Sequence, residues 1–443
     1  MNPNIGEKMN WEIKSHTKMQ NRNNNAQLRY TWYIRIITAV IVFAVPFRIF
    51  GGSHEQPEGK LDPTVILISM DGFRWDYLDR ADTPNFDKLI KNGVKAKSLI
   101  PIFPSKTFPN HYTIVTGLYA ENHGIVANSM YDPEFDARFW IGQGSAPVRE
   151  SRWWGGEPIW VTVEKQGQVA AAMFWPGSET IIQGVQPSYW YVYDESITNE
   201  ERVDQIMSWL ELPSDERPTL LTLYFSDTDN AGHEYGPNSP EVEMAVENLD
   251  KLVGRLLSGL ETRGLINMVN IIIVSDHGMA QLSRDRIIFL DDYINVEAAT
   301  IVEWLPIALW PNKGKEDELF TALFKSHPKL TVYRKEEIPD RYHYRNNRRI
   351  APIIAIPEVG WSVSTHKDFD SHPDMYTGGT HGYETIDKSM HAIFIASGPA
   401  FKKGFLGPSF RNIHIYSLIA EILSLEPAPT DGSIDSVKIY LKQ

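Results

Sequence analysis

The sequence predicts an α/β fold in which helices cover both faces of a central, mostly parallel sheet. Five runs of almost continuous apolar residues have the length of β-strands, and stretches with helical spacing lie between them. Strands that are buried on both faces show such unbroken runs of Val, Ile and Leu. Their alternation with helices favours an open parallel sheet.

The predicted elements follow one another from residue 64 onward. Helices are indicated after Thr83 and after Ser239, because Pro follows each of them at the first helical position. In "PSKTFPNHYTIVTG" (residues 104–117), Asn110 is expected to cap a helix over residues 111–115. Residues about 290–375 break the alternation, which predicts a small inserted subdomain. The strands are expected at residues 64–70, 170–175, 220–225, 269–275 and 392–396.

The composition excludes several classes of protein. The chain has 443 residues, a net charge of −13 and no basic block, so nucleic acid is not expected as a bulk partner. It contains no cysteine, which excludes disulfides, thiolate zinc sites and cysteine catalysis. A metal ion in this protein must therefore be bound by His, Asp, Glu or hydroxyl groups. No protein partner can be inferred.

The N-terminal region is expected to direct export. Residues 1–53 combine a basic stretch with a short apolar run at 36–47, which is typical of a signal peptide. The run falls short of the roughly 20 residues that span a bilayer, although an uncleaved membrane anchor and a buried helix remain alternatives. Translation is expected to start at Met1 or, if the first 18 residues are a misplaced start, at Met19. A linker follows at 54–63, then a catalytic domain at 64–430 and a C-terminal tail at 431–443.

Acidic residues and histidines follow the predicted strands at their carboxyl ends. Ligands bind at this edge of open α/β sheets. With a threonine from the 104–117 stretch, these side chains supply enough ligands for two divalent ions, and zinc suits Asp and imidazole. A bound ion would also activate the threonine hydroxyl as a nucleophile. The seven candidate ligands are Asp71, Thr107, Asp229, His233, Asp276, His277 and His381.

Motifs along the chain resemble the nucleotide pyrophosphatase/phosphodiesterase family of the alkaline phosphatase superfamily. They are "DGFR", "PSKTFPNHYTIVTGLYAENHGIVANSMYDP", "GEPIWVTVEKQG", "FWPGSE", "DNAGHEYGP", "SDHGM" and "GGTHGY". The resemblance covers roughly residues 62–430 and implies an alkaline-phosphatase-like fold with two zinc ions per chain. It assigns Asp229, His233 and His381 to one zinc, and Asp71, Asp276, His277 and Thr107 to the other.

The resemblance also implies a mechanism and a substrate. Thr107 would form a phospho-threonine intermediate, while Asn128 and the backbone of Thr107 and Phe108 would bind the third phosphoryl oxygen. Phe108 and Tyr193 would stack on a nucleobase, with Trp175 nearby, unless these aromatic residues belong to the core. The expected reaction cleaves phosphodiester or phosphoanhydride bonds of small nucleotides and releases nucleoside 5′-monophosphates.

Other functions stay open at this point. The same site would also serve a glycerophospho- or lysophospholipid phosphodiesterase, and a non-catalytic binding protein on this fold is a further alternative.

The chain lacks cysteine and a C-terminal nuclease-like domain, and in this it resembles a bacterial, catalytic-domain-only version of the family with a periplasmic or extracellular location. Contact with a membrane is expected only through the N-terminal segment. The basic run "RYHYRNNRR" at 341–349 is expected to be a solvated loop or hairpin.

Overall fold

The fold is built around an eight-stranded, mostly parallel sheet. The computed structural model describes residues 62–142 and 145–442. Strand β1 (Thr64–Met70) lies in the middle and pairs in parallel with β8 (Leu220–Phe225) and β9 (Val269–Val274). Next to β9 lies β18 (Phe394–Ser397), which runs antiparallel to it. The predicted α/β class with a mostly parallel sheet is therefore confirmed.

The remaining strands of this sheet complete the order β19-β2-β18-β9-β1-β8-β6-β7. Their bounds are Phe405–Gly407 for β19, Gly93–Ala96 for β2, Ala170–Met173 for β6 and Tyr189–Trp190 for β7. Strand β6 pairs in parallel with β8, and β7 pairs in parallel with β6. The side of the sheet beyond β8 is thus entirely parallel.

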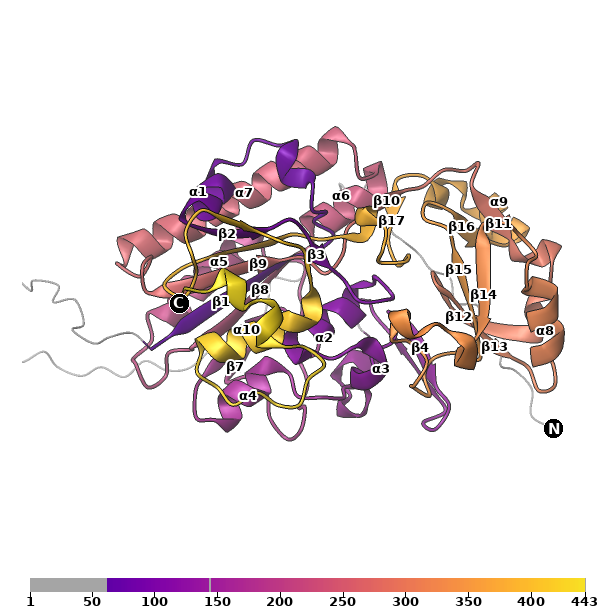
Figure 1. The fold of residues 1–443 in the computed structure, drawn as a ribbon, viewed down its shortest axis with the longest axis horizontal. Helices are drawn as coiled ribbons and strands as arrows, with labels where there is room; N and C mark the ends of the chain where they lie inside the picture. The colour runs from indigo at the N-terminus through magenta and orange to yellow at the C-terminus, as the bar shows by residue number, and fades with distance from the viewer. Residues whose placement is uncertain (1–61, 143–144, 443) are drawn as a thin grey trace, which may run out of the picture. The chain divides into compact units, whose positions relative to one another are not determined.

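Helices cover both faces of the sheet, as Figure 1 shows. Successive residues of β1 point to opposite faces, so Val65 and Leu67 join one apolar cluster while Ile66 and Ile68 join another. The first cluster includes α2 (Thr107–Thr116), α4 (Ile159–Lys165) and α10 (Ile415–Ile422). The second includes α1 (Pro84–Asn92), α5 (Asn199–Leu210) and α7 (Pro240–Thr262). Because the strands are buried on both faces, their sequences are almost continuous runs of apolar residues.

Helix α2 begins at Thr107, three residues before the expected cap at Asn110. Lys106 holds the extended N-cap position, and Pro109 fits the first turn because no backbone N–H is required there. The Asn110 side chain donates instead to the carbonyls of Pro104 and Lys106, each at 2.9 Å. The prediction of a cap at Asn110 was wrong, and the correction places Thr107 in the first turn of the helix.

The region after residue 287 contains a second, smaller sheet, drawn in orange in Figure 1. Its order is β12-β13-β15-β14, with all neighbouring pairs antiparallel. Alternate residues of this sheet face different surroundings. Ile307 and Leu309 belong to a local apolar cluster, whereas Ala308 belongs to the main cluster. The bounds are Ala299–Trp304, Ile307–Pro311, Ile353–Pro357 and Leu330–Arg334 for β12, β13, β15 and β14, and Glu316–Leu323 for α8.

Short elements connect these parts. Strand β3 pairs with β20, β4 with β5, β10 with β17 and β11 with β16. The bounds are Leu99–Ile100 (β3), Phe410–Arg411 (β20), Ser129–Asp132 (β4), Ala137–Trp140 (β5), Ala280–Gln281 (β10), Gly379–Thr380 (β17), Ile287–Phe289 (β11) and Ser362–Ser364 (β16). The short helices are α3 (Ala120–His123), α6 (Asp227–Tyr235) and α9 (His366–Ser371).

The basic run at 341–349 is only partly solvated: Arg341, His343 and Arg348 are exposed. Tyr344 and Arg349 are buried, and the Arg349 guanidinium donates to Asp132 Oδ2 at 2.7 Å. Asp132 is itself fully buried, so its charge requires a cationic partner inside the protein. The expectation of a solvated segment was therefore wrong for Arg349, whose partner lies 217 residues away along the chain, but not for the exposed residues of the run.

The structure describes the C-terminal part of the chain up to residue 442 but not the residues before 62. Val437 and Tyr440, in the segment expected to be a tail, are buried, and the Tyr440 ring packs 5.4 Å from that of Phe394. The expected signal peptide or anchor at 1–53 lies outside the described residues. Within residues 62–142 and 145–442, no helix has the length and apolar character to cross a membrane.

Candidate active site

The predicted ligands gather at the carboxyl edge of the central sheet. Asp71 directly follows β1, and Asp276 and His277 follow shortly after β9. After β8 the chain turns into α6, which carries Asp229 and His233 four residues apart and therefore on one face of the helix. Because β8, β1 and β9 are adjacent and parallel, these side chains converge. His381 joins them directly after β17.

The candidate ligands form two adjoining groups. In the first, Asp229 Oδ1 lies 3.4 Å from His233 Nε2 and 3.8 Å from His381 Nε2. In the second, His277 Nε2 lies 2.9 Å from Asp276 Oδ2 and 3.4 Å from Asp71 Oδ1. Thr107 Oγ1 lies 3.3 Å from the same His277 nitrogen. The structure thus brings all seven predicted ligands together.

Three carboxylate oxygens in these groups are buried without a hydrogen-bond partner among the described residues. They are Asp71 Oδ1, Asp229 Oδ1 and Asp276 Oδ2. Leaving a buried acceptor unpaired is costly, and native proteins do so rarely. The three oxygens point into the same cluster as the imidazole nitrogens. A set of carboxylate and imidazole donors fits divalent zinc, whose positive charge would satisfy these oxygens.

Backbone carbonyls orient the imidazoles of the cluster. A carbonyl only accepts, so each Nδ1 in such a pair carries the proton and each Nε2 keeps its lone pair. The Nε2 atoms are the ones that face the carboxylates. The Nδ1–H groups of His233, His277 and His381 donate, each at 2.9 Å, to the carbonyls of Gly379, Gly278 and Ser105.

The electrostatics of the cluster favour bound cations. Burial, together with the nearby charges of Asp276 and Asp229, raises the pKa of Asp71 well above its ordinary value. Burial also lowers the pKa of His381 well below its ordinary value, and the charge of His277 adds to this effect. Several carboxylates withdrawn from water repel one another unless positive charge lies between them. Divalent ions would supply that charge.

Asn128 contacts the first turn of α2. Its Oδ1 accepts the N–H of Phe108 at 3.0 Å. This contact occupies the Phe108 amide, which the resemblance had assigned to the phosphoryl oxygen. Asn128 Nδ2 and the N–H of Thr107 have no acceptor in the part of the chain that the structure describes. These two donors, beside the positive end of the α2 dipole, suit an anion.

The predicted substrate-binding aromatic residues have different surroundings. Phe108 packs edge-on against Phe139 with ring centroids 6.0 Å apart and remains half-buried. Tyr193 is 39% exposed and packs against Phe174 at 5.1 Å. Trp175 is only 2% exposed, and its Nε1 donates to the carbonyl of His111 at 3.1 Å. Of the three predicted residues, Phe108 and Tyr193 therefore offer partly open rings and Trp175 does not.

Tyr224, which was missed as a functional candidate, and His111 support the cluster. The Tyr224 hydroxyl donates to Asp71 Oδ2 at 2.6 Å. Tyr224 lies opposite Ser69 in the β1–β8 register, which only the folded sheet reveals. His111 Nδ1 donates to the carbonyl of Thr107 at 2.9 Å, one turn away on α2. His111 Nε2 contacts Ser69 Oγ at 2.8 Å, so neither nitrogen of His111 is left for a metal ion.

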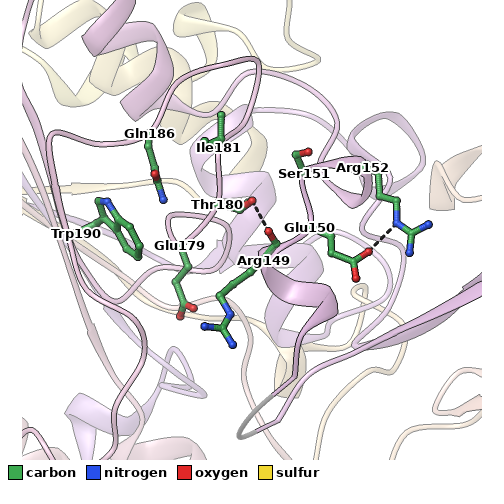
Figure 2. Close-up of a pocket in the computed structure, with 9 residues that line it drawn as sticks. All are labelled: Arg149, Glu150, Ser151, Arg152, Glu179, Thr180, Ile181, Gln186 and Trp190. Atoms are coloured by element: carbon green, nitrogen blue, oxygen red, sulfur yellow. Dashed lines mark hydrogen bonds and ion pairs between the residues drawn. The ribbon is translucent and has the colours of Figure 1, made fainter.

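A cavity of about 600 Å³, drawn in Figure 2, is lined by residues other than the candidate ligands. Arg149, Glu179 and Trp190 are among its lining residues. The Glu179 carboxylate accepts the N–H of Tyr193 at 2.9 Å, which links one wall of the cavity to the candidate stacking residue. None of the seven predicted metal ligands lines this cavity.

The fold and the cluster define a metal-dependent hydrolase of the alkaline-phosphatase type. The family model for type I phosphodiesterase / nucleotide pyrophosphatase matches residues 65–384. The chain belongs to this family, and it is an enzyme that hydrolyses phosphodiester or pyrophosphate bonds.

Several known proteins are similar to the chain in sequence. Ectonucleotide pyrophosphatase/phosphodiesterase family member 5 from Homo sapiens is 41% identical over 379 residues, which are 85% of this chain and 78% of the human protein. A venom phosphodiesterase from Macrovipera lebetinus is 41% identical over 87% of this chain, but only 46% of the venom protein is covered. Bis(5′-adenosyl)-triphosphatase enpp4 from Xenopus laevis is 38% identical over 91% of this chain and 87% of the frog protein.

The structural comparison agrees with the sequence comparison. An inactive threonine-to-alanine variant of murine ectonucleotide pyrophosphatase/phosphodiesterase 5, solved in complex with AMP, superposes with a TM-score of 0.82. It is 40% identical, and the match covers 86% of this chain and 100% of the murine chain. The family prediction is therefore confirmed. The human, viper, frog and murine relatives are animal proteins, so the bacterial character of the chain stays a prediction.

Proposed function

We propose that the protein is an exported two-zinc nucleotide pyrophosphatase/phosphodiesterase that acts through a phospho-threonine intermediate. The observation that carries this proposal is the position of Thr107, whose Oγ1 lies 3.3 Å from His277 Nε2 in a cluster with three unpaired carboxylate oxygens. A nucleophile and its activating site are thus in contact.

The two groups of side chains support the following assignment of metal ligands. Asp229, His233 and His381 would bind one zinc, and Asp71, Asp276, His277 and Thr107 Oγ1 would bind the other. When bound, the ions lower the pKa of the attacking hydroxyl and neutralise charge on the phosphoryl oxygens. The carbonyls that fix the imidazole Nδ1 atoms keep the coordinating nitrogens directed at these positions.

The reaction has two displacements at phosphorus. In the first, Thr107 Oγ gives up its proton to solvent and forms a bond to phosphorus, while the bond from phosphorus to the ester or anhydride oxygen breaks and that oxygen departs with the electron pair. In the second, water attacks the phospho-threonine, the bond to Thr107 breaks, and nucleoside 5′-monophosphate is released. Asn128 Nδ2 and the Thr107 N–H would donate to the phosphoryl oxygen that the ions do not contact.

Small nucleotides are the proposed substrates. The murine relative was solved with AMP, and the frog relative is named for hydrolysis of a bis-adenosyl triphosphate. Phe108 and Tyr193 offer partly open rings on which a base can stack. The human, viper and frog relatives are not named for a phospholipid substrate, so the glycerophospholipid alternative gains no support. Export rests on the basic and apolar pattern of residues 1–53 and on the names of the venom and ecto-enzyme relatives.

A substrate panel with metal analysis tests this proposal. ATP, a diadenosine polyphosphate, glycerophosphocholine and a phosphomonoester are compared, and the products are identified. We expect hydrolysis of the two nucleotides with release of AMP and about two zinc ions per chain. Preferred cleavage of glycerophosphocholine would overturn the nucleotide specificity, and a single bound ion would overturn the two-zinc site.

A further inference from the structure

The loop that carries Asn128 is held on both sides by the subdomain inserted after residue 287. We infer that Tyr344 and Glu303 of this subdomain are positioning residues that fix Asn128 for catalysis. The inference rests on the proposed function, in which Asn128 Nδ2 binds a phosphoryl oxygen. It assigns a role in the reaction to a subdomain that contributes none of the seven candidate metal ligands.

The first contact lies on the N-terminal side of Asn128. The Tyr344 hydroxyl donates to the carbonyl of Val126 at 2.9 Å. Tyr344 is buried, and its ring packs edge-on against Phe103 with centroids 5.2 Å apart. Burial raises the pKa of Tyr344 far above its ordinary value, so the hydroxyl stays a neutral donor. A buried hydrogen bond of this kind restricts the backbone two residues before Asn128.

The second contact lies on the C-terminal side. The N–H of Ser129 donates to Glu303 Oε2 at 3.3 Å. Glu303 follows a β-bulge in the β12–β13 pair, where Ile301 pairs with Leu309 but Glu303 pairs with Ala308. A bulge of this kind redirects the side chains that follow it. The other carboxylate oxygen accepts the N–H of Trp304 at 3.0 Å, which fixes the orientation of the Glu303 side chain.

Further hydrogen bonds join the subdomain to the residues around the loop that carries Asn128. The N–H groups of Arg345 and Asn346 donate to Glu121 Oε2 at 2.7 and 2.8 Å. Arg349 binds Asp132 and also donates to the carbonyl of Gly124 at 2.8 Å. Residues 344–349 therefore contact the chain before, within and after the loop at 124–128. Tyr344 and Glu303 act on the residues nearest to Asn128.

These contacts matter because the Asn128 side chain is itself oriented. Its Oδ1 accepts the Phe108 N–H at 3.0 Å, which leaves Nδ2 for the substrate. A donor that binds charge in the transition state must be held in place before the reaction, and a displacement of about 1 Å can cost about 100-fold in rate. Loosening either flank of Asn128 should therefore lower the rate without removing any group that touches the substrate.

The test is a double-mutant cycle on the full chain loaded with zinc. Tyr344→Phe removes one hydroxyl, and Glu303→Ala removes the carboxylate. We expect each to lower kcat by about 3- to 30-fold on a nitrophenyl ester of a nucleoside monophosphate, with KM little changed. Asn128→Ala should lower kcat by about 100- to 1,000-fold. In the Asn128→Ala background, the Tyr344 and Glu303 substitutions should change kcat by less than about 2-fold.

Matched variants separate positioning from a general loss of stability. Tyr333→Phe removes another hydroxyl of the same subdomain, and Glu318→Ala removes an exposed carboxylate of α8. Both should keep the wild-type kcat. Glu303→Gln keeps an acceptor of the same length and should restore most of the rate lost in Glu303→Ala. Melting temperature and zinc content are measured for every variant.

The outcomes distinguish this inference from the proposed function. Equal losses in the wild-type and Asn128→Ala backgrounds, or no loss in Tyr344→Phe and Glu303→Ala, would overturn the inference and leave the role of Asn128 intact. A wild-type rate in Asn128→Ala would overturn both. If Glu303→Ala does not fold, Tyr344→Phe, which changes a single hydroxyl, decides the result.

Discussion

The metal-binding cluster and the aromatic residues beside it are held in different ways. Asp71, Asp276 and His277 are almost fully buried at the ends of adjacent central strands. The backbone orients Asp276 and His277, and the Tyr224 hydroxyl orients Asp71. Tyr193 follows the two-residue edge strand β7 and contacts mainly other aromatic rings. The comparison teaches that the proposed chemistry would be built on the buried centre of the sheet, whereas Tyr193, a proposed stacking residue, lies near its edge.

Removing the metal ions should have the largest effect. Dialysis against a strong chelator should abolish diester hydrolysis, because the cluster would lose the charge that activates Thr107. Zinc should restore activity better than magnesium, since imidazole ligands suit zinc. Asp71→Ala and His381→Ala should each remove one ion, as measured by elemental analysis. Full activity in a verified metal-free sample would contradict the two-zinc proposal.

Thr107→Ala should have the next largest effect. Loss of the nucleophile should lower kcat on the order of 10³- to 10⁶-fold, while zinc content and melting temperature stay unchanged. Thr107→Ser should keep part of the rate because the oxygen remains. Two displacements also predict retained configuration at phosphorus, which a chiral phosphorothioate substrate reports. A near wild-type rate in Thr107→Ala would show that the hydroxyl is not the nucleophile.

Tyr224→Phe should weaken metal binding although it removes none of the candidate ligands. Its hydroxyl donates to Asp71 Oδ2 at 2.6 Å, and loss of such a partner typically costs about 10- to 100-fold in metal affinity. A zinc-buffered titration measures this change. Tyr191→Phe is the matched control, because the Tyr191 hydroxyl contacts Gln205 rather than a candidate ligand. Equal zinc affinity in the two variants would contradict the supporting role.

The aromatic residues should give the smallest effect, and one that depends on the substrate. Base stacking contributes about 1–3 kcal/mol, and the exposure of Tyr193 places it near the lower end, or about 5-fold in kcat/KM. Phe108→Ala and Tyr193→Ala should therefore weaken hydrolysis of nucleotide esters. A nitrophenyl methylphosphonate, which has no base, should be little affected. Equal losses on both substrates would indicate a packing defect near Thr107 instead.

Much of the fold and of the candidate site was predictable because both depend on local patterns. The central strands show unbroken apolar runs, and polar residues that follow such strands must lie at one edge of a parallel sheet. Asp71 and Asp276 could be placed in this way without knowledge of the topology. The start of α2 was predicted four residues too late, at 111 instead of Thr107, because the Asn110 side chain does not cap the helix but donates to the carbonyls of Pro104 and Lys106.

The sequence by itself determined which residues are the candidate ligands and the candidate nucleophile, since the period of each strand and the residue after it are local properties. Only the tertiary structure decided which other side chains support them. Tyr224 has no local signal that distinguishes it from a core residue, yet its hydroxyl contacts Asp71. Arg349 of the basic segment was misjudged because burial of an arginine depends on a distant carboxylate, here Asp132, and distance along the chain does not predict distance in space.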